Sequence, residues 1–156
     1  MTRKIDTIIV HCSATRASQM IGAATIRKWH TDPKPQGRGW KDIGYAYVID
    51  RFGVIHLGRD LDGDGDVDEE IGAHALGHNA HSIGVCLVGG VAEDGKTPEA
   101  NFTPHQMNNL DALLGLLKKR HGDDIVIIGH RDLPGVAKAC PSFDVAHWLE
   151  TKEVRL

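Results

Sequence analysis

Apolar residues occur in short runs along the chain, and polar or glycine-rich segments close each run. Runs rich in β-branched residues predict strands at 5–10, 45–49, 54–57, 82–88 and 125–128. The second and third runs are separated by only four residues, 50–53, and predict a β-hairpin in which Gly53 supplies a positive φ. We expect the run at 82–88 to be a central strand and those at 5–10 and 125–128 to be buried.

Other segments have the period of a helix. The clearest is 103–120, where Thr103 serves as N-cap, Pro104 occupies the first helical position and Gln106 completes a capping box. We expect a short helix at 21–30 and a last helix after Pro141, capped by Ser142. The mixture of strands and helices predicts an α/β fold. It would be a single domain over 1–156, with a central mixed β-sheet flanked by about three helices.

Composition narrows the classes of protein to which the chain can belong. Of its 156 residues, 41% are hydrophobic and 25% are charged, which is typical of a globular domain. The formal net charge of -3 provides no basic field, so we expect no nucleic-acid partner and no membrane attachment. Residues 1–6 lack the apolar core of a signal peptide. The chain is therefore expected to be synthesised in the cytoplasm without a signal peptide.

Two histidines occupy matching places. His11 and His130 each follow an apolar strand, so parallel strands would bring both imidazoles to one edge of the sheet. Cys140 follows ten residues later, after a loop that can fold back. Two imidazoles and one thiolate leave a fourth tetrahedral position open, as in catalytic zinc sites. From spacing alone, a buried core histidine and an inert cysteine are an equally weighted alternative.

A set of motifs in fixed order carries a family resemblance. The motifs are His11-Cys12-Ser13-Ala14-Thr15, Gly39-Trp40-Lys41-Asp42-Ile43-Gly44-Tyr45, Gly58-Arg59, Gly72-Ala73-His74-Ala75, Asn79 with Ser82-Ile83-Gly84-Val85, Gly129-His130-Arg131-Asp132 and Lys138-Ala139-Cys140-Pro141. Together they resemble the type 2 zinc N-acetylmuramoyl-L-alanine amidases, which include short phage amidases and are related to peptidoglycan-recognition proteins. The resemblance extends from about Ile5 to Trp148.

The resemblance implies roles for particular residues. It implies zinc ligands at His11, His130 and Cys140, and catalytic roles for Tyr45 and Lys138. Lys138 would stabilise the oxyanion. Tyr45 would hydrogen-bond the attacking water or relay a proton to the leaving amine.

Three more residues are candidates for contact with the substrate: His74, which matches a histidine near the cleft in relatives, Asn79 and Trp40. For His74, substrate contact and structural hydrogen bonding are equally weighted. Asn79 suits a turn better than chemistry, and Trp40 suits the core better than the cleft. Cys12 and Cys86 lie in apolar strand contexts and are expected to be inert.

An acidic segment, 60–70, departs from the family pattern and has the form of an insertion loop. It resembles a calcium loop, with acids at alternate positions: Asp60, Asp62, Asp64, Asp66 and Asp68. Position 12 of such a loop should be a bidentate glutamate but is Ile71, for which Glu69 or Glu70 would have to substitute. A solvated acidic turn without calcium is the simpler alternative.

The function implied is zinc-dependent hydrolysis of the amide bond between N-acetylmuramic acid and L-alanine in peptidoglycan. The enzyme would be a monomeric phage or prophage endolysin that acts on the cell wall after the membrane is breached. Two alternatives stay open: a cytoplasmic amidase that recycles muropeptides, and a non-catalytic peptidoglycan-binding module. Some short phage amidases also bind phage RNA polymerase, so this partner is a further prediction of the resemblance.

Overall fold

The apolar runs of the sequence build one five-stranded mixed sheet in the computed structural model, which describes residues 3–156. The strand order is β4-β3-β5-β1-β7. The bounds are β1 Thr7–Cys12, β3 Tyr47–Ile49, β4 Ile55–Leu57, β5 Ser82–Leu87 and β7 Val126–Gly129. Strand β1 pairs in parallel with β5 and β7, β3 pairs in parallel with β5, and β4 completes the predicted antiparallel hairpin. A separate parallel pair joins β2 (Thr15–Arg16) to β6 (Gly90–Val91).

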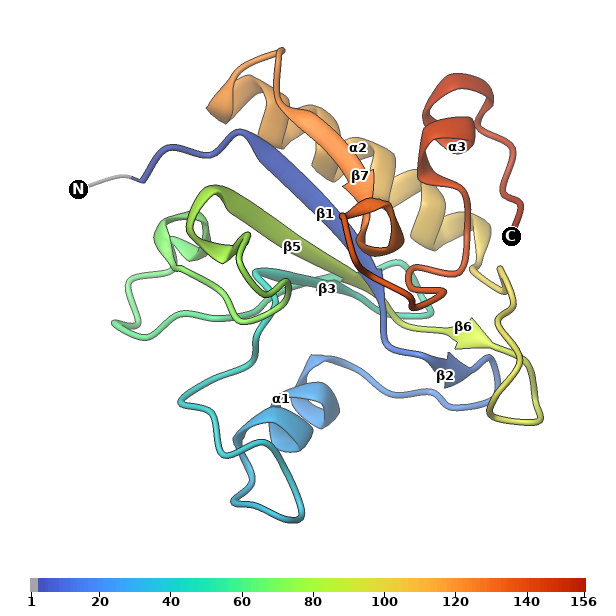
Figure 1. Cartoon of the computed structure of the whole chain (residues 1–156), viewed down its shortest axis with the longest axis horizontal. Helices are drawn as coiled ribbons and strands as arrows, with labels where there is room; N and C mark the ends of the chain where they lie inside the picture. Colours follow the sequence, from blue (N-terminus) through green and yellow to red (C-terminus); the bar gives the residue numbers. More distant parts are fainter. Residues whose placement is uncertain (1–2) are drawn as a thin grey trace.

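Helices cover both faces of the sheet (Figure 1). Helices α2 (Pro104–His121) and α3 (Val145–Thr151) lie on one side, and α1 (Ala23–Thr31) lies on the other. Because side chains alternate along a strand, Ile8 and Val10 join the core under α2 and α3, whereas Ile9 belongs to a cluster on the opposite face. His11 shares that opposite face with Ile9, so its side chain points away from the main core.

The α/β fold with a mixed sheet and three helices is confirmed. So are the Thr103 capping box, in which Gln106 N donates to Thr103 Oγ1 at 3.1 Å, and the positive φ of Gly53, +85°. None of the helices within residues 3–156 is long and apolar enough to cross a membrane.

Three local predictions are wrong. His11 does not follow the first strand but lies within it, because the pairing of β1 with β5 continues through His11 and Cys12, beyond the last pair with β7 at Val10. Strand β7 is an edge strand and not a buried one, and Val126 is 53% exposed. Asp144, not Ser142, caps α3 by accepting a hydrogen bond from His147 N at 3.0 Å.

Candidate functional site

Three side chains meet at the carboxyl ends of β1 and β7. One ligand atom each from His11, His130 and Cys140 lies within 4.8 Å of the other two. The parallel register pairs Val10 with Gly129, so the next residues, His11 and His130, are neighbours, with ring centroids 4.6 Å apart. The loop before α3 returns Cys140 to this point, where its carbonyl accepts a hydrogen bond from Arg131 N at 2.8 Å. The sequence prediction that these residues converge is therefore confirmed.

The donor atoms of this cluster are suited to a metal ion. His11 is 1% exposed, and burial, followed by the nearby His74, His130 and Lys138, holds its pKa well below the ordinary value. The imidazole is therefore neutral. Its Nδ1 lies 3.8 Å from Cys140 Sγ, while its Nε2 is engaged by His74. Cys12 N donates to Cys140 Sγ at 3.3 Å, but the contact with the Cys12 thiol and burial raise the pKa of Cys140 well above its ordinary value, so the free side chain is a thiol. Two neutral imidazoles and a cysteine sulfur that ionises on metal binding form a set that fits zinc.

Tyr45 lies beside this cluster, two residues before β3 begins. Its ring centroid is 5.0 Å from that of His11 and 5.6 Å from that of His30. Burial, together with the neighbouring cysteines, raises the pKa of Tyr45 well above its ordinary value. The phenol therefore keeps its proton at neutral pH and can donate a hydrogen bond to a group bound at the cluster.

Lys138 is exposed on the loop that carries Cys140. After burial, its positive charge is the next cause that lowers the pKa of His130, and it also lowers that of His11. The ammonium therefore adds positive charge to the surroundings of both imidazoles.

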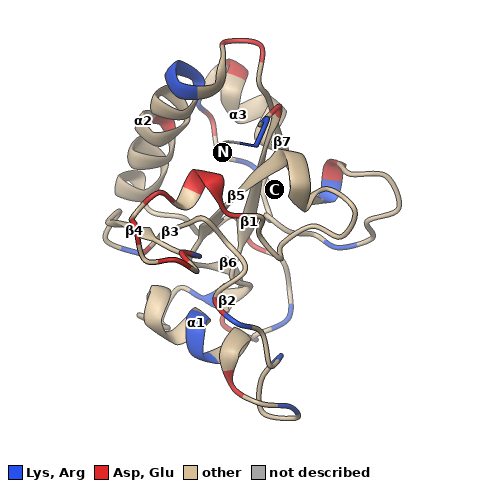
Figure 2. Cartoon of the chain, turned by 90° about the vertical axis from the view of Figure 1, so that its left-hand side faces the viewer, with Lys and Arg blue, Asp and Glu red and all other residues tan. Residues whose placement is uncertain are grey.

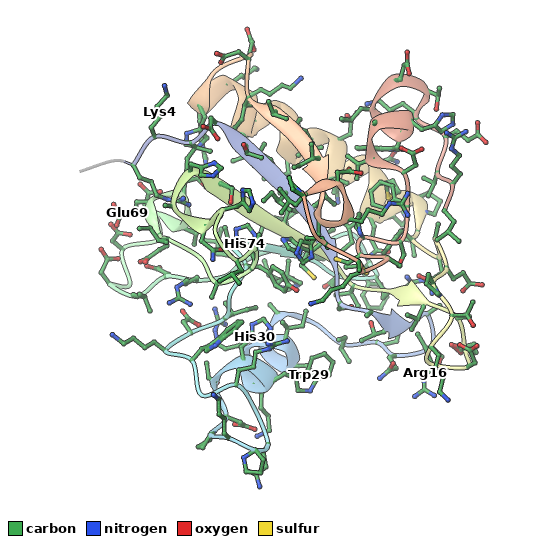
Figure 3. The ribbon with its side chains drawn as sticks, viewed as in Figure 1. Lys4, Arg16, Trp29, His30, Glu69 and His74 are labelled. Atoms are coloured by element: carbon green, nitrogen blue, oxygen red, sulfur yellow. The ribbon has the colours of Figure 1, made fainter. Side chains whose placement is uncertain are left out.

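The three residues expected near the substrate take different places. His74 lies close to the middle of the molecule, with Nδ1 2.8 Å from His11 Nε2 (Figure 3). Asn79 Oδ1 accepts hydrogen bonds from the backbone N–H groups of His74 and Ala75, which is the turn role expected. Trp40 is half-buried and lies outside the buried core clusters, with its ring 4.8 Å from that of His30, so it covers His30 and not the core.

The acidic segment lies apart from this cluster. It faces the viewer in Figure 2, and Glu69 marks its place at the edge of the molecule in Figure 3. Carboxylate oxygens of Asp60, Asp62 and Asp64 lie within 4.8 Å of one another, as do those of Asp62, Glu69 and Glu70. Exposed acidic groups of this kind are common without an ion, so calcium binding is unsupported and stays a prediction.

The carboxylates of Asp60, Asp62 and Asp64 accept hydrogen bonds from backbone N–H groups within the loop, whereas those of the other two members of the predicted calcium set contact the short helix that follows and the rest of the fold. Asp66 caps the short 3-10 helix Val67–Glu69 by accepting a hydrogen bond from Asp68 N at 3.2 Å. The Asp68 carboxylate is buried and accepts hydrogen bonds from Tyr47 Oη at 2.5 Å and from Arg120 Nη1 at 3.3 Å, and it lies 2.8 Å from His121 Nε2. Asp68 is therefore directed into the fold and away from the other loop carboxylates.

Sequence reasoning missed two contributions to the site. Cys12, expected to be inert, supports Cys140 through its backbone N–H. Ser82 lies under His74, with its Oγ 3.3 Å from His74 Nε2. Both residues belong to the ordered motifs, but spacing along a chain does not reveal which side chains meet.

Comparison with known proteins gives a consistent result. The family model described as N-acetylmuramoyl-L-alanine amidase matches residues 1–143. The chain is 44% identical to an endolysin of Escherichia phage T7 over 149 residues, which are 96% of this chain and 88% of the relative. It is 45% identical to an endolysin of Enterobacteria phage T3, with the same shares covered.

Solved structures share the fold. The endolysin amidase LysCS from Clostridium intestinale is 26% identical, with a TM-score of 0.73 over 96% of this chain and 84% of that one. The PGRP-SA protein of Apis mellifera is 22% identical, with a TM-score of 0.69 over 97% of this chain and 85% of that one.

Proposed function

The chain belongs to the N-acetylmuramoyl-L-alanine amidase family, and we propose that its site hydrolyses the amide bond between N-acetylmuramic acid and L-alanine through a zinc ion held by His11, His130 and Cys140. The observation that carries this proposal is the convergence of two imidazoles and one sulfur at the edge of the sheet. Such a set leaves a coordination position for water, as in catalytic zinc sites.

The residues around the cluster supply the rest of the chemistry. When bound, zinc polarises a carbonyl and lowers the pKa of its water to about 7. The Lys138 ammonium stabilises the negative charge that develops on the scissile carbonyl oxygen. Because Tyr45 keeps its proton, it acts as a donor at Oη, toward the attacking water or the leaving amine, and not as a base.

Peptidoglycan is the substrate that the relatives support. Relatives named endolysins match nearly the whole chain, which favours the cell wall as the place of action over the recycling of soluble muropeptides. Tyr45 and Lys138 accompany the two histidines and the cysteine, and this complete set favours catalysis over binding alone. Arrival at the wall after the membrane is breached is part of the same proposal.

Digestion of purified peptidoglycan tests the proposal, with mass spectrometry of the fragments released. We expect stem peptides that begin with L-alanine, lost with a zinc chelator and restored by added zinc. If soluble muropeptides are cut while sacculi stay intact, the recycling alternative replaces the endolysin. If neither substrate is cut at full zinc occupancy, the chain is a binding module.

A further inference from the structure

A chain of three hydrogen bonds runs from the proposed zinc ligand His11 to a backbone carbonyl. His11 Nε2 lies 2.8 Å from His74 Nδ1, and His74 Nε2 lies 3.3 Å from Ser82 Oγ. Ser82 Oγ donates to the carbonyl of His78 at 2.7 Å. We propose that His74 and Ser82 are positioning residues that select the tautomer of His11. This inference rests on the zinc site proposed above.

The donor and the acceptor of each of these three hydrogen bonds follow from the last one, which ends at the carbonyl of His78. The His78 carbonyl can only accept, so the single hydroxyl proton of Ser82 points toward it. Ser82 Oγ must then accept from His74 Nε2, which therefore carries the ring proton. A neutral imidazole protonated at Nε2 has its lone pair on Nδ1, so His74 accepts the proton of His11 Nε2.

This direction leaves the Nδ1 lone pair of His11 free on the side of the metal. That atom is 3.8 Å from Cys140 Sγ, within the ligand cluster. If these hydrogen bonds were donated in the opposite direction, His11 would carry its proton on Nδ1 and could not bind a cation there. Partners of this kind fix the tautomer and the ring orientation of metal-binding histidines.

The surroundings of His74 are shaped to hold its ring. A side chain at Gly84 of β5 would place its Cβ 2.6 Å from His74 Cγ, and one at Gly72 would lie 2.8 Å from His74 Cδ2. Both glycines therefore leave the space that the ring occupies. Asn79 Oδ1 accepts from His74 N at 2.9 Å and so holds the backbone. Ser82 is fully buried in β5, on the same face as Gly84.

The zinc affinity of the full-length protein, measured by competition with a chelator, tests the inference. We expect His74→Ala and Ser82→Ala each to weaken zinc binding by about 10- to 100-fold. His74→Asn should keep most of the affinity, because its Oδ1 takes the place of Nδ1 as acceptor for His11. His81→Asn is the matched control: His81 contacts the surface carboxylate of Asp6 at 2.8 Å, so zinc binding should not change.

A spectroscopic measurement separates positioning from a general structural effect. In the zinc-loaded protein, nitrogen-15 NMR of the ring nitrogens should show His11 protonated at Nε2 and bound to zinc through Nδ1. His74 should be protonated at Nε2.

Zinc on Nε2 of His11 would overturn the inference, as would unchanged affinity in folded His74→Ala protein. If the wild-type chain bound no zinc, the proposed function would fail instead, so the two failures are distinguishable.

Discussion

The buried carboxylate of Asp68 gives the sharpest test of how the acidic segment is attached to the fold. Its side chain is 8% exposed and meets the phenol of Tyr47, the guanidinium of Arg120 and the imidazole of His121. Asp68→Ala would leave the hydroxyl of Tyr47, a residue only 4% exposed, without its acceptor. An orphaned buried donor costs about 1–3 kcal/mol, and a lost hydrogen bond to a charged group costs a similar amount.

Arg120 is half exposed and would recover solvation, so its contact adds little. We therefore expect Asp68→Ala to lower the free energy of unfolding by about 2–4 kcal/mol. For a domain of this size, the melting temperature should fall by roughly 6–12 °C. Urea titration followed by circular dichroism measures the first quantity, and calorimetry measures the second.

Asp64→Ala is the matched control. It removes the same charge from the same loop, but the Asp64 carboxylate is exposed and its hydrogen bond is to Asp66 N. Its effect should stay within about 0.5 kcal/mol.

A double-mutant cycle adds a second constraint. Tyr47→Phe should be destabilising in the wild-type background and close to neutral beside Asp68→Ala, because it then removes an orphaned hydroxyl. The reasoning would be refuted if Asp68→Ala lowered the free energy of unfolding no more than Asp64→Ala does. It would also be refuted if the free-energy changes of Asp68→Ala and Tyr47→Phe were strictly additive.

The remaining predictions concern the site and the response to ions and pH. Cys140→Ala should abolish zinc retention and activity, and an unchanged metal content by atomic absorption would contradict the ligand assignment. Lys138→Ala should keep zinc yet lose about 10²- to 10³-fold in kcat, because it removes charge stabilisation and not a ligand; loss of zinc would point to a different role. Burial, then Arg38 and Arg59, lowers the pKa of His30 from 6.5 to about 4, so its contribution to stability is intact above pH 6.5 and declines as the pH falls toward 4. His30→Asn retains an acceptor for Gly44 N and should flatten that part of the acid slope in urea titrations at pH 7 and pH 4.5, whereas an unchanged slope would assign it to other groups. If 60–70 is a calcium loop, millimolar calcium should raise the melting temperature, and no change would remove the hypothesis.

Features that depend on residues close together along the chain could be predicted from the sequence. The alternation of apolar runs determined the strands and the hairpin, and Thr103, Pro104 and Gln106 determined where α2 begins, because capping involves residues within one turn of each other. The ordered motifs identified the family, and the two histidines that follow apolar runs indicated one edge of the sheet. These features depend only on neighbours along the chain or on a pattern that covers all of it.

Other features depend on which distant segments meet. Pairing with β5 extended β1 to Cys12 and placed His11 inside the strand. The position of β7 at the edge of the sheet exposed Val126, and packing against Tyr47 and His121 turned Asp68 inward. The contact between His11 and His74 joins residues 63 positions apart. Propensity and spacing carry no information on such contacts, because sheet order and side-chain packing are decided only when the whole chain folds.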